Sequence, residues 1–95
     1  MPIHSETWNA VSSLLQTAYG EVGWKLTVTS EGIESEEQFR EFLEHNELEL
    51  AWDELAELGA PHGRTSFWLL LARAAEEMEL PEKAAEASRR ALLAA

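Results

Sequence analysis

Residues 46–59 read NELELAWDELAELG, and this stretch decides the fold class. Its apolar side chains recur at the three- and four-residue spacing of one helix face, and acidic residues occupy the opposite face. Asn46 fits the N-cap position, with Glu49 at the reciprocal position, and Gly59 fits the C-terminal stop. The apolar face consists of Leu48, Ala51, Trp52, Leu55 and Leu58. The stretch therefore predicts an amphipathic helix.

The segment just upstream predicts another helix, which joins the first at a tight corner. Residues 35–38, SEEQ, fit the capping-box pattern with which many helices begin. The predicted helix continues through Phe39 and Phe42 and stops at His45 and Asn46.

Two more helices are expected downstream, after a loop indicated by the composition of residues 59–63. We expect Thr65 or Ser66 to cap the first of them and Pro81 to begin the second. The inward face of the first is predicted to hold Phe67, Trp68, Leu71, Ala74, Ala75 and Met78. The side of the second that faces its neighbour is predicted to hold mostly small residues, namely Ala84, Ala85, Ser88, Ala91 and Leu92.

The N-terminal third predicts one helix and one extended segment. Ser5 fits an N-cap, Gly20 fits a C-terminal stop, and the apolar stripe between them is Trp8, Val11, Leu14, Leu15, Ala18 and Tyr19. Over residues 22–29, Trp24, Leu26 and Val28 alternate with polar residues, which indicates an extended stretch. It either packs along the helices, which we favour, or pairs with its copy in a dimer. We expect an all-α fold, a compact array of about five helices with one extended segment near residues 22–29.

Composition limits the class of protein. The 95 residues, 45% of them apolar, fit a single helical domain over residues 1–95. No run of about 18 apolar residues is present, so we expect no membrane span. The N-terminus carries no basic or apolar signal region, and the chain has no cysteine. These features favour a cytoplasmic protein of bacterial type.

The negative charge is concentrated in one part of the chain. Residues 31–58 contain eleven acidic residues and one basic residue, Arg40, and so carry −10 of the total charge of −11. Such a field repels phosphate backbones and attracts basic proteins. We therefore expect a basic protein partner and no nucleic acid, with a merely solvated acidic face as the alternative.

No catalytic or metal-binding motif is recognisable. The histidines, His4, His45 and His62, accompany no metal motif, and no glycine-rich phosphate loop is present. Glu41 and His45 could donate two metal ligands from one helix face, but chance explains such a pair in a chain so rich in glutamate. We predict no enzyme activity, no catalytic residue, no metal and no cofactor.

A protein-binding surface is the remaining candidate. Leu50 falls among the acidic side chains of its helix, which is typical of an apolar interface anchor or of a contact with the loop or the preceding helix. Leu69 is out of phase in the same way, and Trp24 fits either a core position or an exposed anchor. The predicted partner-binding residues are Glu41, Glu44, Glu49, Leu50, Asp53 and Glu57.

Two resemblances to known proteins follow from these residues. Residues 67–72, FWLLLA, followed by Ala84 and Ala91, resemble one tetratricopeptide unit, which implies an adapter that binds a peptide. Over residues 36–80, the run FREFLEHNELELAWDEL (39–55) followed by SFWLLLA (66–72) is similar to small bacterial immunity proteins of the contact-dependent-inhibition and polymorphic-toxin type. That resemblance implies a cytosolic antitoxin that occludes a cognate toxin, often a basic nuclease.

Immunity function is thus the leading hypothesis for this sequence. The alternatives are the tetratricopeptide-like adapter and a homodimeric housekeeping protein without a toxin partner. The chain itself is expected to be a monomer or a homodimer.

Overall fold

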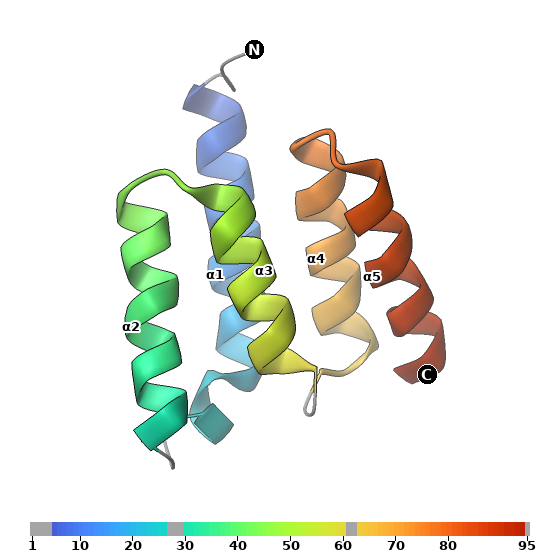
Figure 1. Cartoon of the computed structure of the whole chain (residues 1–95). Coiled ribbons are helices and arrows are strands. Elements are labelled where there is room, and N and C mark those ends of the chain that lie inside the picture. The colour runs from blue at the N-terminus through green and yellow to red at the C-terminus, as the bar shows by residue number, and fades with distance from the viewer. Residues whose placement is uncertain (1–4, 27–29, 61–62, 95) are drawn as a thin grey trace.

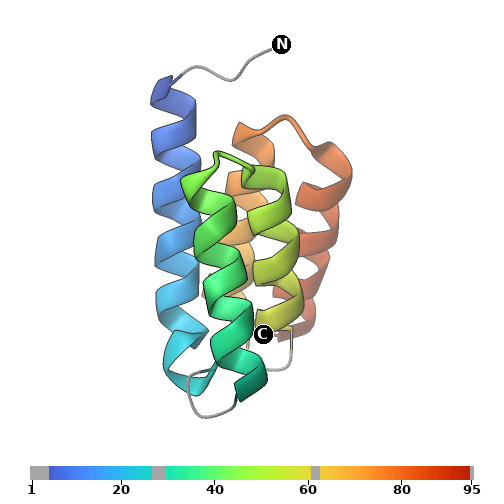
Figure 2. The ribbon, with the colours of Figure 1, turned by 60° about the vertical axis from the view of Figure 1, so that its left-hand side comes forward.

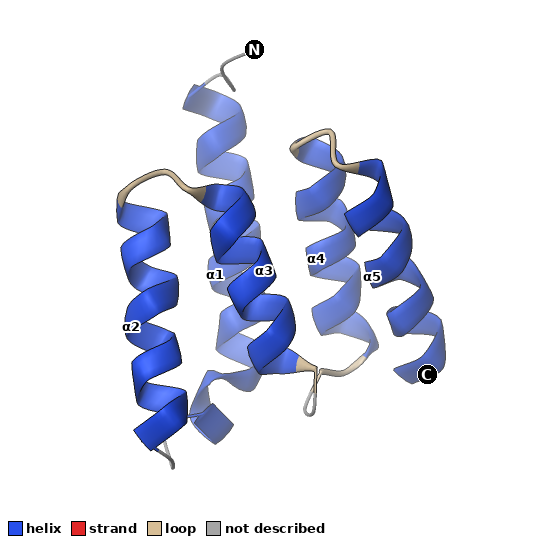
Figure 3. Cartoon of the chain, in the orientation of Figure 1, coloured by secondary structure: helices blue, strands red, loops and turns tan. Residues whose placement is uncertain are grey.

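The computed structural model describes residues 5–26, 30–60 and 63–94, and within them the side chains of residues 6–22, 37–60 and 63–94. These ranges form α1 (Ser5–Leu26), α2 (Ser30–Glu44), α3 (Leu48–Gly59), α4 (Thr65–Glu77) and α5 (Pro81–Ala94). Successive helices run in opposite directions (Figure 1), and no strand occurs in the described ranges (Figure 3). The prediction of an all-α fold of about five helices is confirmed.

The first helix, α1, continues past the predicted stop at Gly20, so the predicted extended segment is wrong over residues 22–26. The buried residues of this helix remain three or four positions apart on both sides of Gly20, and they are Val11, Leu15, Ala18 and Val22. Burial of Val22 on the helical stripe outweighs the local alternation, because tertiary packing decides helix ends more than short patterns do. Residues 27–29 and the side chain of Trp24 lie outside the described part of the chain.

The corner between α2 and α3 differs from the expected one. α2 begins at Ser30, upstream of the predicted capping box. Asn46 adopts a left-handed φ of 56°, and the N–H groups of Asn46 and Glu47 donate to the carbonyls of Leu43 and Phe42. This arrangement ends α2, and asparagine tolerates it better than most residues. Asn46 is therefore not the N-cap of α3. The N-cap is Glu47, whose side chain makes no capping hydrogen bond.

The predicted caps of α4 are also wrong. Its N-cap is Arg64, with no side-chain cap hydrogen bond. The hydroxyl of Thr65 donates instead to the carbonyl oxygen of Ala91 at 3.2 Å, and the hydroxyl of Ser66 donates to the carboxylate of Glu21 at 2.5 Å. Both hydroxyls therefore form hydrogen bonds to other helices instead of capping α4, and local sequence patterns do not reveal such bonds.

The helix α4 is central and packs against α1, α3 and α5 (Figures 1 and 2). Its predicted inward face is buried throughout. On α5 the buried side is Ala84, Ala87 and Ala91, so close packing through small residues is confirmed. The predicted Ala85, Ser88 and Leu92 are exposed instead. Among the described helices, none has both the length and the apolar character needed to cross a membrane.

Candidate functional site

Four leucines are exposed in the described residues, namely Leu50, Leu69, Leu92 and Leu93, and of these Leu50 lines a hollow of the surface. Leu50 is 47% exposed and Leu69 is 53% exposed, although both belong to helices whose other large apolar side chains are mostly buried. Leu50 lies in the first turns of α3, next to the turn between α4 and α5. The α2–α3 corner and the α4–α5 turn are at the same end of the molecule (Figure 1).

A surface hollow lies between these two corners, and we call it the Leu50 hollow. It is lined by Asn46, Glu47, Leu48, Glu49, Leu50, Met78 and Leu80. Apolar side chains from α3 and from the α4–α5 turn thus meet there beside two carboxylates. Leu50 shares the hollow both with Asn46 and Glu47 of the preceding α2–α3 corner and with Met78 and Leu80 of the α4–α5 turn.

Two left-handed residues shape the hollow. Asn46 turns the chain into α3, and Glu79, with a φ of 58°, turns it from α4 towards α5. At the second turn the N–H groups of Glu79 and Leu80 donate to the carbonyls of Glu76 and Ala75. These bonds close the last turn of α4 and place Leu80 at the hollow.

A second concave feature, which we call the α3–α5 groove, runs beside the acidic residues of α3. Its lining consists of Trp52, Asp53, Ala56, Glu57, Ala60, Trp68, Glu86 and Arg90. In the described residues the backbones of α3 and α5 each lie close to that of α4 and not to each other, so only side chains span the groove. The small side chains of Ala56 and Ala60 leave space on the α3 side of the groove.

Ion pairs and aromatic contacts organise the groove. Lys83 of α5 reaches across to Asp53, with Nζ and Oδ1 2.5 Å apart, and its Nζ lies 5.3 Å from the centre of the Trp52 ring. Arg90 lies over the ring of Trp68 at 5.0 Å. The groove therefore combines aromatic faces with charges of both signs.

The structure separates the predicted partner-binding residues into three groups. Glu49 and Leu50 line the Leu50 hollow, and Asp53 and Glu57 line the α3–α5 groove. Asp53 is paired with Lys83, so its charge is partly neutralised within the chain. Glu41 and Glu44 are exposed on α2 and line neither feature.

Sequence reasoning missed the α5 wall of the groove. Glu86 and Arg90 form this wall, and Lys83, three positions before Glu86, reaches Asp53 from the same face of α5. The spacing of three and four positions was the available signal. These residues are about 30 positions from α3 along the chain, so the sequence does not show that they face it.

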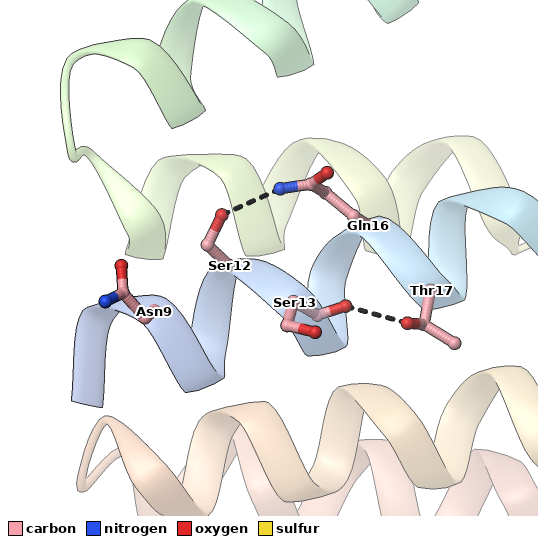
Figure 4. Close-up of a pocket in the computed structure, with 5 residues that line it drawn as sticks. All are labelled: Asn9, Ser12, Ser13, Gln16 and Thr17. Atoms are coloured by element: carbon pink, nitrogen blue, oxygen red, sulfur yellow. Dashed lines mark hydrogen bonds between the residues drawn. The ribbon is translucent and has the colours of Figure 1, made fainter. Parts of the chain in front are cut away.

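A separate polar hollow lies on the outward face of α1 and is shown in Figure 4. It is lined by Asn9, Ser12, Ser13, Gln16 and Thr17. Gln16 donates to the hydroxyl of Ser12 at 3.0 Å, and Thr17 donates to the carbonyl of Ser13 at 2.8 Å (Figure 4). These side chains bond within their own helix, and the hollow offers no charged group.

The next feature is the distribution of metal-ligand side chains in the part of the chain that the structure describes. No three His, Cys, Asp or Glu side chains are grouped there closely enough to hold a metal ion. His4 and His62 are outside the described ranges, and His45 is exposed at the α2–α3 corner.

No protein-family model, curated protein or solved structure matches this chain. The resemblances to immunity proteins and to a tetratricopeptide unit remain predictions from the sequence.

Proposed function

We propose that this chain is a protein-binding domain whose α3 face binds a basic protein. By the α3 face we mean the exposed side chains of Glu49, Leu50, Asp53 and Glu57. The observation that carries the proposal is the half-exposed Leu50 at a hollow that also contains Met78, Leu80 and the carboxylates of Glu47 and Glu49. An apolar anchor surrounded by polar groups is a common arrangement at the centre of protein interfaces. Single exposed leucines are normal on protein surfaces, but an exposed leucine beside other apolar side chains forms a patch that a partner can bury.

The charge distribution supports a basic partner. The residues from 31 to 58, which include α3, carry −10 of the total charge of −11. An acidic face of this kind raises the rate of encounter with a positively charged surface, and the apolar hollow then slows dissociation. Attraction and anchoring thus come from neighbouring residues of one helix.

The finer proposal is an immunity protein that neutralises a basic toxin by occlusion. Toxins that act on nucleic acids present basic surfaces to the phosphate backbone, and an acidic protein competes for the same surface. The resemblance of residues 36–80 to bacterial immunity proteins supports this assignment.

The test is capture of partners from the native host with the full chain as bait. The proposal expects a basic protein, encoded by a neighbouring gene and toxic when expressed alone. Leu50→Ser should reduce its capture strongly, whereas Leu69→Ser, the matched change at an equally exposed leucine outside both concave features, should leave it unchanged. Capture that is equal for both variants would contradict the role of the α3 face.

Two other outcomes would favour the alternative functions. Binding of a short peptide on an array, with no captured basic protein, would indicate an adapter. Sedimentation at twice the monomer mass, with loss of the dimer in Leu50→Ser, would indicate a homodimer that uses this face.

A further inference from the structure

Two basic side chains of α5 lie over tryptophan rings in the α3–α5 groove. Nζ of Lys83 is 5.3 Å from the centre of the Trp52 ring, and Cζ of Arg90 is 5.0 Å from the centre of the Trp68 ring. Both distances are within the range over which the face of an aromatic ring attracts a cation. The groove thus attracts cations that the chain itself supplies.

Each of these cations also meets a carboxylate. Lys83 pairs with Asp53 at 2.5 Å, and Arg90 pairs with Glu86 at 3.4 Å. The Asp53 side chain is 47% exposed, so its ion pair is open to exchange with a cation from solution. The structure therefore contains the same unit twice, an indole face, a carboxylate and a cation from α5.

Glu57 is a third carboxylate of the groove, and it has no ion-pair or hydrogen-bond partner among the described residues. It is four positions after Asp53, so the two carboxylates lie one helical turn apart on one face of α3. A planar guanidinium stacks on an indole and donates N–H groups to two acceptors at once, which an ammonium group does less well.

We propose that the α3–α5 groove binds an arginine side chain in place of the Lys83 ammonium. Trp52 is only 4% exposed, so the guanidinium stacks on the part of its ring that Lys83 uncovers when it is displaced, and it donates to Asp53 and Glu57. Lys83 acts as an internal competitor for the same position. The source of the arginine, the basic partner, rests on the proposed function. The cation binding itself rests on the groove alone.

The test is a titration of the full, isotope-labelled chain with N-acetyl-arginine amide, followed through the indole N–H signals. N-acetyl-citrulline amide has nearly the same shape without the charge and is the matched control ligand. We expect a saturable shift of the Trp52 signal with the arginine compound, no such shift with the citrulline compound, and an unchanged signal from Trp8, which is outside the groove. Equal responses to the two ligands, or no response at Trp52, would overturn the proposal.

Substitutions separate competition from nonspecific attraction. Lys83→Met and Lys83→Gln should each strengthen binding of the arginine amide by about threefold or more, because the internal competitor is removed. Glu57→Gln should weaken it by about threefold, whereas Glu76→Gln, the same change on an exposed position of α4, should not. Unchanged affinity in both Lys83 variants, or equal effects at Glu57 and Glu76, would count against the proposal.

The inference and the proposed function fail in different ways. If Leu50→Ser abolishes partner binding while the arginine amide leaves Trp52 unaffected, the inference is wrong and the proposed function stands. If the amide binds as expected but no basic partner depends on Leu50, the proposed function is wrong and the groove remains a cation site.

Discussion

The indole Nε1 of Trp52 donates a hydrogen bond to the backbone carbonyl oxygen of Leu71, at 2.8 Å, and so joins α3 to the central helix α4. Trp52 is buried, and its ring also lines the α3–α5 groove. One side chain thus fixes the position of the acidic helix and forms part of its concave surface. The stability of the fold and the geometry of the candidate site are coupled at this residue.

Trp52→Phe should lower the free energy of unfolding by about 2 kcal/mol. The substitution removes the hydrogen bond, a contribution of about 1 kcal/mol, and leaves space beside Leu71 because the phenyl ring is smaller. Urea denaturation followed by circular dichroism measures the change. Trp8→Phe, at the partly buried edge of the core, is the matched control and should cost less. Equal losses from the two variants would show that the hydrogen bond to Leu71 contributes little.

Charge reversal on α3 should slow association with a basic partner. The double variant Glu49→Lys and Glu57→Lys changes one residue of the hollow and one of the groove, and it spares Asp53, which already pairs with Lys83. We expect the association rate at low salt to fall about tenfold and its salt dependence to weaken, as measured by stopped flow.

The control for this experiment has the same net charge but a different location. Glu76→Lys with Glu77→Lys changes two exposed residues of α4, so it alters the overall field equally and leaves the α3 face intact. If both double variants slow association to the same extent, net charge alone attracts the partner, and the α3 face has no special role.

The sequence predicted the helices wherever a buried stripe and a strong breaker coincide, as at Gly59 and Pro81. It misplaced the end of α1 because a glycine inside a helix and a glycine after a helix look alike locally. It misplaced the start of α2 because the capping-box pattern of residues 35–38 lies inside that helix. Asn46 is equally ambiguous, since asparagine suits both an N-cap and a left-handed helix end. Which of these roles a residue takes is decided by packing against distant helices.

For the site, the sequence identified Leu50 and the acidic residues of α3 through their helical phase. It could not reveal that Met78 and Leu80 complete the hollow, because this depends on the left-handed turn at Glu79. Nor could it reveal that Lys83 reaches Asp53, because that pair depends on how α5 packs against α4. Features within one helix were predictable, and features between helices were not.

Glu79→Gly should stabilise the protein. Glu79 has a φ of 58°, a conformation that is strained for residues with a side chain and costs about 1 kcal/mol relative to glycine. We expect the free energy of unfolding to rise by about 0.5–1 kcal/mol, as measured by urea denaturation. Asn46→Gly should give a smaller gain, because asparagine tolerates a φ of 56°. A loss of stability in Glu79→Gly would mean that the glutamate side chain makes a contact that outweighs the strain.

Gly20 and Gly59 should respond to the same substitution with opposite signs. A methyl group added at Gly20 meets no other atom within 4 Å, and the residue lies inside α1, where alanine is favoured over glycine. Gly20→Ala should therefore raise the free energy of unfolding by about 0.5–1 kcal/mol.

At Gly59 the added methyl group would overlap the ring of Phe67, which is fully buried and has no room to move away. Gly59→Ala should cost about 1–3 kcal/mol, and the pair is compared by urea denaturation under one condition. If Gly20→Ala is destabilising, α1 ends at this glycine in a left-handed conformation, and the continuation of the helix to Leu26 is wrong.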